Sequence, residues 1–96
     1  MRVEHVAVWV GDLDRMRDFY SRYFGTAVGP KYVNTTKRFE SYFLTFPDGG
    51  ARLELMRLPG LAAARDGPRV GLAHIAVALG SEAAVDALTT RLRDDG

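Results

Sequence analysis

The first patterned segment of the chain runs from Val3 to Val10, where side chains of different character alternate. Because successive side chains of a strand point to opposite faces, this pattern predicts a β-strand in which His5, Ala7 and Trp9 share one face. The other face would carry Glu4, Val6, Val8 and Val10. We expect the valine face to cover a helix.

A helix is predicted directly after this strand. Asp12 is a favourable N-cap residue, and Gly25 is typical of a helix end. Between them, apolar residues recur at helical spacing, namely Leu13, Met16, Phe19, Tyr20 and Tyr23. The first two elements are therefore a strand followed by an amphipathic helix.

Three further strands are predicted after the helix, over residues 28–34, 39–46 and 51–58. All three are rich in β-branched, aromatic or alternating apolar residues. The sequence Pro47-Asp48-Gly49-Gly50 predicts a turn before the last of them. Residues 59–70 contain mostly Gly, Ala, Pro and charged residues, which indicates a surface connection.

The segment after this connection repeats the beginning of the chain. His5-Val-Ala-Val-Trp-Val-Gly11 aligns without gaps with His74-Ile-Ala-Val-Ala-Leu-Gly80, at an offset of 74 − 5 = 69 residues and with four identities in seven. We therefore expect one domain over residues 1–96, with a first module at 1–58, a connection at 59–70 and the start of a second module at 71–96.

The second module should contain a strand beginning near Gly71 and a helix capped by Ser81. Val85, Leu88 and Leu92 repeat the apolar helix face of the first module. The repeat stops at Gly96, where three more strands would follow. A single strand leaves exposed hydrogen-bonding edges, so we expect either a truncated sequence or strands supplied by another chain, and favour truncation.

Composition removes several classes of function. The chain has 13 Lys and Arg residues against 12 Asp and Glu residues, without a basic run, so it lacks the electrostatic footprint of a protein that binds nucleic acid or an anionic membrane. No apolar run approaches the roughly 20 residues of a membrane span, and no signal peptide is recognisable. We expect a cytoplasmic protein that acts on a small molecule.

The chemistry-bearing residues point to a metal. Because the chain has no cysteine, only His and carboxylate side chains can be ligands. Both of its two histidines, His5 and His74, occupy the same position of the repeat, and alternation along 51–58 predicts that Glu54 points to the same side as His5, away from the helix. We predict a divalent-metal site with these three ligands.

Other interpretations of these residues stay open. Each histidine alone is more typical of a hydrogen-bonded strand residue, and Glu40 competes with Glu54 as a ligand, although Glu40 shares a face with apolar residues. Candidates for a substrate pocket are Trp9, Phe43 and Met56, although aromatic and thioether side chains on a strand are more often plain core. Arg38 and Arg52 suit an anionic substrate group, but we interpret them as ordinary surface residues.

These motifs resemble the vicinal oxygen chelate superfamily, which includes glyoxalase I, extradiol dioxygenases and bleomycin resistance proteins. The similar segments are the opening His5–Leu13, Phe19-Tyr20, Phe24-Gly25, Leu53-Glu54-Leu55-Met56 and Gly71-Leu-Ala-His74-Ile-Ala-Val. The resemblance implies an α+β fold of paired βαβββ modules, with the second module incomplete in this chain. It also implies a homodimer in which first-module ligands of one chain meet second-module ligands of the other.

In glyoxalase I-like relatives four ligands surround the metal, and His5, Glu54 and His74 match three of them. The fourth, a glutamate linked to proton transfer, would lie beyond Gly96, so no residue here is assigned as the base. The resemblance implies a glyoxalase I-like lyase or isomerase that uses Zn, Ni, Fe, Mn or Co and acts on a substrate with vicinal oxygens. The alternatives are an extradiol-type dioxygenase, a metal-free bleomycin-resistance-like binding protein, or a degenerate module.

Overall fold

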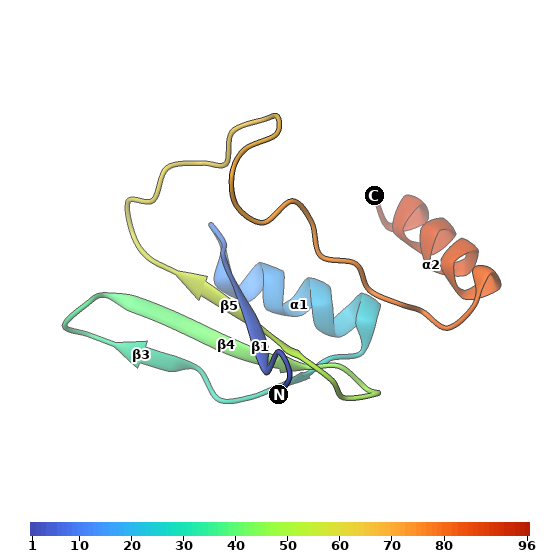
Figure 1. The fold of residues 1–96 in the computed structure, drawn as a ribbon, viewed down its shortest axis with the longest axis horizontal. Coiled ribbons are helices and arrows are strands. Elements are labelled where there is room, and N and C mark those ends of the chain that lie inside the picture. The colour runs from blue at the N-terminus through green and yellow to red at the C-terminus, as the bar shows by residue number, and fades with distance from the viewer. The chain divides into compact units, whose positions relative to one another are not determined.

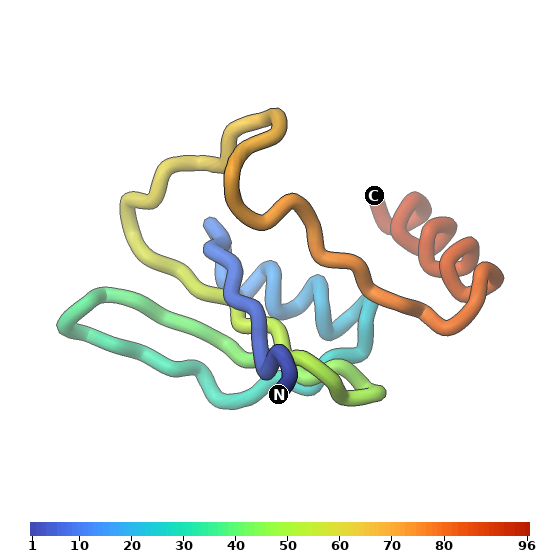
Figure 2. The backbone as a smooth tube through the Cα atoms, in the orientation of Figure 1, coloured from blue at the N-terminus to red at the C-terminus, as the bar shows by residue number.

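The computed structural model describes residues 1–96 and divides them into two compact units, Met1–Ala63 and Ala64–Gly96. The division falls inside the predicted connection, residues 59–70. From the end of the first unit to Gly80 the backbone forms neither helix nor strand, as the yellow to orange tube in Figure 2 shows. The two units are described in turn.

The first unit has the predicted order of strand, helix and further strands. Its elements are β1 (His5–Trp9), α1 (Leu13–Phe24), β2 (Ala27–Val28), β3 (Tyr32–Asn34), β4 (Phe39–Thr45) and β5 (Arg52–Arg57). The strands form one sheet in the order β1-β5-β4-β2, with β3 also paired to β4, and α1 lies along one face (Figure 1). β1 is parallel to β5 and the other pairs are antiparallel. The predicted α+β class and the βαβββ module are confirmed.

The single strand predicted over residues 28–34 is wrong in detail, because two short strands take its place. Three residues lie between Val28 and Tyr32, but only two lie between their partners on β4, Leu44 and Ser41. The intervening Gly29-Pro30-Lys31 therefore contains an extra residue, as in a β-bulge. Pro30 has no N–H to donate to the ladder, which explains why pairing is interrupted here.

The core of this unit lies between α1 and the sheet. β5 buries alternate residues, Leu53 and Leu55, against α1, and β4 contributes Tyr42 and Leu44. Val8 and Val10 pack against this cluster, so the predicted helix-covering face of β1 is confirmed. The caps of α1 are also as predicted: the Asp12 side chain accepts from Arg15 N at 3.0 Å, and Gly25 has a left-handed backbone.

The second unit contains α2 (Glu82–Asp95), which Ser81 caps by accepting from Ala84 N at 3.1 Å. The predicted helix is confirmed, whereas the strand predicted near Gly71 is wrong: residues 72–79 form no strand. A strand is defined by hydrogen bonds to a neighbour, and no other strand is present in this unit to supply them. No residue of α2 is buried, and Val85 is 47% exposed. Neither helix of the protein has the length and apolar character needed to span a bilayer.

Candidate functional site

The sheet face opposite α1 carries most of the predicted site residues. The pairing register sets Ala7 of β1 beside Glu54 of β5, and Glu54 beside Phe43 of β4. Because side chains alternate along each strand, His5, Ala7 and Trp9 share one face with alternate residues of β5 and β4. We call this the open face, and its chemistry-bearing and larger side chains in the centre of the sheet are His5, Trp9, Ser41, Phe43, Arg52, Glu54 and Met56.

Two of the three predicted metal ligands meet on the open face. His5 Nε2 lies 3.7 Å from Glu54 Oε1. The Glu54 side chain is only 12% exposed, and His5 is the partner of its carboxylate. Imidazole nitrogen and carboxylate oxygen are both ligands of divalent cations, so this pair fits two positions of a metal site.

The third predicted ligand belongs to the other unit. His74 lies exposed in the segment between Gly71 and Gly80 that precedes α2. No three His, Asp or Glu side chains of the structure gather closely enough to hold a metal ion. The structure thus brings together His5 and Glu54, while His74 stays a predicted ligand from the second unit.

A carboxylate that the sequence pattern assigned to the wrong face also touches this site. Glu4 was predicted to share the valine face, but β1 begins only at His5, so Glu4 lies before the regular alternation. Its carboxylate contacts His5 Nδ1 and is also held by Arg52, whose Nε donates at 2.8 Å. These bonds, first the one to His5 and then those to Arg52, lower the pKa of Glu4 below its ordinary value.

Arg52 is the second residue that sequence reasoning undervalued. Its guanidinium lies over the Phe43 ring, 4.2 Å from the centroid, and Phe43 in turn makes an edge contact with His5 at 5.1 Å between ring centroids. The available signal was the position of Arg52, which is two residues before Glu54 and therefore on the same face. Arginine is so common on surfaces that this signal alone is weak.

The predicted pocket residues share the open face. Trp9 is 54% exposed, and Met56 beside it in the register is partly buried, as is Phe43. None of the three belongs to the buried core under α1, which removes the plain-core interpretation within this unit. They form an apolar border next to His5 and Glu54.

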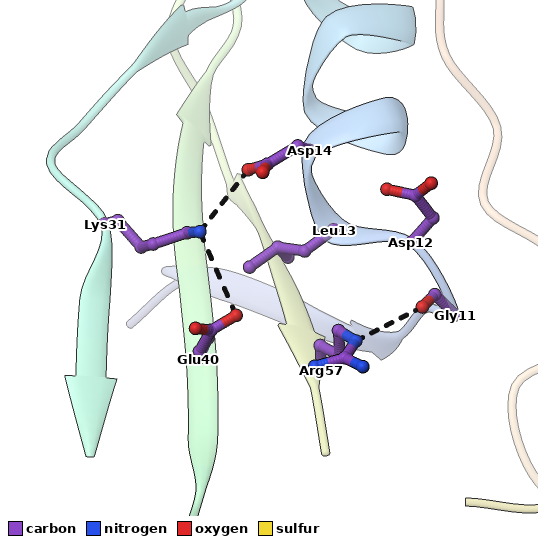
Figure 3. Close-up of a pocket in the computed structure, with 7 residues that line it drawn as sticks. All are labelled: Gly11, Asp12, Leu13, Asp14, Lys31, Glu40 and Arg57. Atoms are coloured by element: carbon purple, nitrogen blue, oxygen red, sulfur yellow. Dashed lines mark hydrogen bonds and ion pairs between the residues drawn. The ribbon is translucent and has the colours of Figure 1, made fainter. Parts of the chain in front are cut away.

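A separate pocket of about 340 Å³ lies on the other side of the sheet, at the beginning of α1. Figure 3 shows its lining, which comprises Gly11, Asp12, Leu13, Asp14, Lys31, Glu40 and Arg57. Lys31 Nζ lies 3.5 Å from Asp14 Oδ1 and 3.9 Å from Glu40 Oε2. Arg57 Nε donates to the Gly11 carbonyl at 3.4 Å.

The charges of this pocket largely satisfy one another. Asp14 is further bonded by the Tyr42 hydroxyl at 3.1 Å, and that bond, with Lys31 and Arg17 nearby, lowers the pKa of Asp14. Glu40, the competitor of Glu54 as a ligand, lies here, on the face of the sheet opposite His5 and beside the cation Lys31. The pocket holds no histidine or nucleophile, so we place the candidate site on the open face.

Comparison with known proteins agrees with this fold. The model of the Glyoxalase/Bleomycin resistance protein/Dioxygenase superfamily matches residues 2–96. The chain belongs to this superfamily. Among curated proteins, none matches the chain. The matched residues include the second unit as well as the first.

Solved structures of superfamily members resemble the chain closely. A glyoxalase/bleomycin resistance protein/dioxygenase domain from Frankia sp. EAN1pec has a TM-score of 0.83 and 25% identity, covering 100% of this chain and 74% of that one. The trypanothione-dependent glyoxalase I of Leishmania major has a TM-score of 0.80 and 26% identity, covering 99% of this chain. This chain spans 66% of the length of the Leishmania enzyme.

A third structure shares the fold alone. The fosfomycin resistance protein FosX from Listeria monocytogenes, solved with Mn(II) and a dihydroxypropylphosphonic acid, has a TM-score of 0.70 and 18% identity, covering 96% of this chain and 67% of that one. Proteins with different activities therefore share this scaffold, so the fold does not choose the reaction.

Proposed function

We propose that the chain is a divalent-metal-dependent lyase or isomerase of the glyoxalase I type, acting on a small molecule with two vicinal oxygens. The observation that carries this proposal is the meeting of His5 Nε2 with the carboxylate of Glu54, whose side chain is only 12% exposed. The likeness to the Leishmania major glyoxalase I, at 26% identity over 99% of the chain, supports this reaction class.

In this proposal His5 and Glu54 hold the ion from the first unit, and His74 is the ligand from the second unit. The ion, which can be Zn, Ni, Fe, Mn or Co, would stabilise negative charge that develops on the two substrate oxygens. Two nitrogens and one carboxylate oxygen leave coordination positions for those oxygens.

The residues beside the ligands would select the substrate. Trp9, Phe43 and Met56 offer an apolar border, which suits the carbon skeleton of a small ligand and excludes water from its reacting part. Relatives that pair modules between chains suggest a homodimer of this protein as well. We place the protein in the cytoplasm.

The proposal is tested by activity after metal loading. The protein is stripped with a chelator and reloaded separately with each of the five ions. Isomerisation of a methylglyoxal–thiol adduct is then followed by thioester absorbance, with glutathione and other thiols as the thiol part. We expect metal-dependent turnover in the wild type and loss of turnover in Glu54→Gln, while Asp18→Asn, an exposed carboxylate on α1, retains it.

Two other outcomes of these assays would indicate a different function for the protein. Oxygen consumption with catechols in the iron-loaded protein, without isomerisation, would make it an extradiol-type dioxygenase. Tight binding of a bleomycin-like ligand that is unchanged by chelation, with no turnover on either substrate, would make it a metal-free binding protein. Either result contradicts the proposed lyase function.

A further inference from the structure

We propose that Glu4 is a positioning residue for the candidate metal ligand His5, and that Arg52 holds Glu4 in place. The proposal rests on the proposed function, since it assigns His5 Nε2 as the metal-binding atom. Glu4 itself would not touch the ion or the substrate. It would fix the proton on His5 Nδ1 and the orientation of the ring.

The geometry of the imidazole supports this assignment. A neutral imidazole has one nitrogen that donates and one that accepts, so a fixed acceptor at one nitrogen determines the role of the other. The Glu4 carboxylate, an acceptor, contacts His5 Nδ1, and the opposite nitrogen Nε2 lies 3.7 Å from Glu54 Oε1. With the proton on Nδ1, the lone pair of Nε2 is directed toward the Glu54 side of the ring, where a cation would bind.

Arg52 restrains Glu4 through both backbone and side chain. Arg52 N donates to the Glu4 carbonyl at 2.9 Å, while Arg52 Nε and Nη2 both contact Glu4 Oε1. The same guanidinium lies over Phe43, and Phe43 contacts the His5 ring. The four side chains of His5, Glu4, Arg52 and Phe43 therefore form a closed ring of contacts, in which each is held from two sides.

A contribution to stability alone explains this arrangement poorly. The side chains of His5, Glu4 and Arg52 are 41%, 48% and 37% exposed, and ion pairs at that exposure add little to the free energy of folding. A carboxylate bonded to the second nitrogen of a metal-binding histidine, in contrast, typically changes metal affinity by 10- to 100-fold. The two roles therefore differ in what a substitution of Glu4 would change.

The first test uses the metal-free protein. In a His74→Ala background His5 is the only histidine, so its two ring nitrogens give unambiguous ¹⁵N NMR signals at a pH where imidazole is neutral. We expect the Nδ1–H tautomer to dominate in the wild-type Glu4 protein and to lose its dominance in Glu4→Ala. Glu4→Gln, which keeps a side-chain oxygen able to accept, should restore the tautomer in part. An unchanged tautomer in Glu4→Ala would overturn the proposal.

The second test measures the dissociation constant for Co(II) by titration in proteins that keep His74. We expect binding to be about 10- to 100-fold weaker in Glu4→Ala and about as much weaker in Arg52→Met. Asp18→Asn is the matched control, because Asp18 also pairs with an arginine, Arg17, at 2.9 Å but lies on α1. Equal affinities in Glu4→Ala and Asp18→Asn would overturn the positioning role.

The two tests separate failure of this inference from failure of the proposed function. A wild-type protein that binds no Co(II) contradicts the metal-dependent function, and with it the assignment of Nε2 as a ligand. The tautomer experiment needs no metal, so it tests the Glu4–His5 contact independently. Weaker Co(II) binding with an unchanged tautomer would show that Glu4 acts through its charge alone, and it also overturns the positioning role.

Discussion

Leu55 and Glu54 are neighbours on β5 that point to opposite faces, so their substitutions should have opposite consequences. Leu55 is 0% exposed and lies in the core beneath α1, on a strand paired on both sides by β1 and β4. Because two ladders hold its backbone, the space left by Leu55→Ala cannot readily collapse. We therefore expect a loss of about 4 kcal/mol, near the upper part of the range for buried leucines.

Such a loss approaches the whole stability of a unit this small, so Leu55→Val is the more informative variant. Removing one methylene equivalent should cost about 1 kcal/mol. With a urea dependence of about 1 kcal/mol per molar, the unfolding midpoint would fall by about 1 M. Circular dichroism and tryptophan fluorescence of Trp9 give two independent readings of this midpoint.

Glu54→Gln should behave in the opposite way in the metal-free protein. The Glu54 side chain is only 12% exposed and its partner His5 lies 3.7 Å away, so replacing the carboxylate with a neutral amide should leave the midpoint unchanged or raise it. The same change should abolish metal binding. The reasoning is refuted if Leu55→Val leaves the midpoint unchanged, or if Glu54→Gln lowers it more than Leu55→Val does.

Three further changes test other parts of the first unit by urea denaturation. The Tyr42 hydrogen bond and nearby cations lower the pKa of Asp14, so its contribution to stability is present at neutral pH and is lost as the pH falls through its folded-state pKa. Between about pH 7 and about pH 3 the unfolding midpoint of Asp14→Asn should therefore change less than that of the wild type. An equal change in the two proteins would contradict this. Gly25→Ala should cost about 1 kcal/mol, because Gly25 has φ 64°; an unchanged midpoint would argue against that backbone. Ser41→Ala should be neutral or stabilising, because the buried Ser41 hydroxyl has no partner, and a clear loss of stability would show a hidden hydrogen bond.

Most of the first unit could be predicted from its sequence because the signals there are local. The caps Asp12 and Gly25 act within one turn of α1, and the alternation along β5 depends only on the period of a strand. The same alternation placed Glu54 on the face of His5, and the register confirms that the two side chains share it. The apolar pattern of residues 28–34 does not predict the split into β2 and β3, which follows from Pro30 and its missing N–H.

The features that the sequence did not predict depend on pairing and contacts between segments, which the pattern of a single strand does not contain. Alternation predicts the wrong face for Glu4 because β1 begins only at His5. Residues 72–79 share the sequence pattern of β1, yet a strand also requires a neighbouring ladder, which this pattern cannot supply. The contacts of Arg52 with Glu4 and Phe43 connect three different segments, so they became visible only in the folded unit.

Metal stoichiometry tests the central claim of a shared His5, Glu54 and His74 site most directly. Purified protein is dialysed against a divalent ion and then analysed by plasma mass spectrometry, for the wild type, His5→Ala, His74→Ala and the control Asp18→Asn. We predict that the wild type and Asp18→Asn retain a stoichiometric amount of metal, and that each histidine variant loses most of it. Retention of metal by both histidine variants, or its absence from the wild type, would contradict the proposed site.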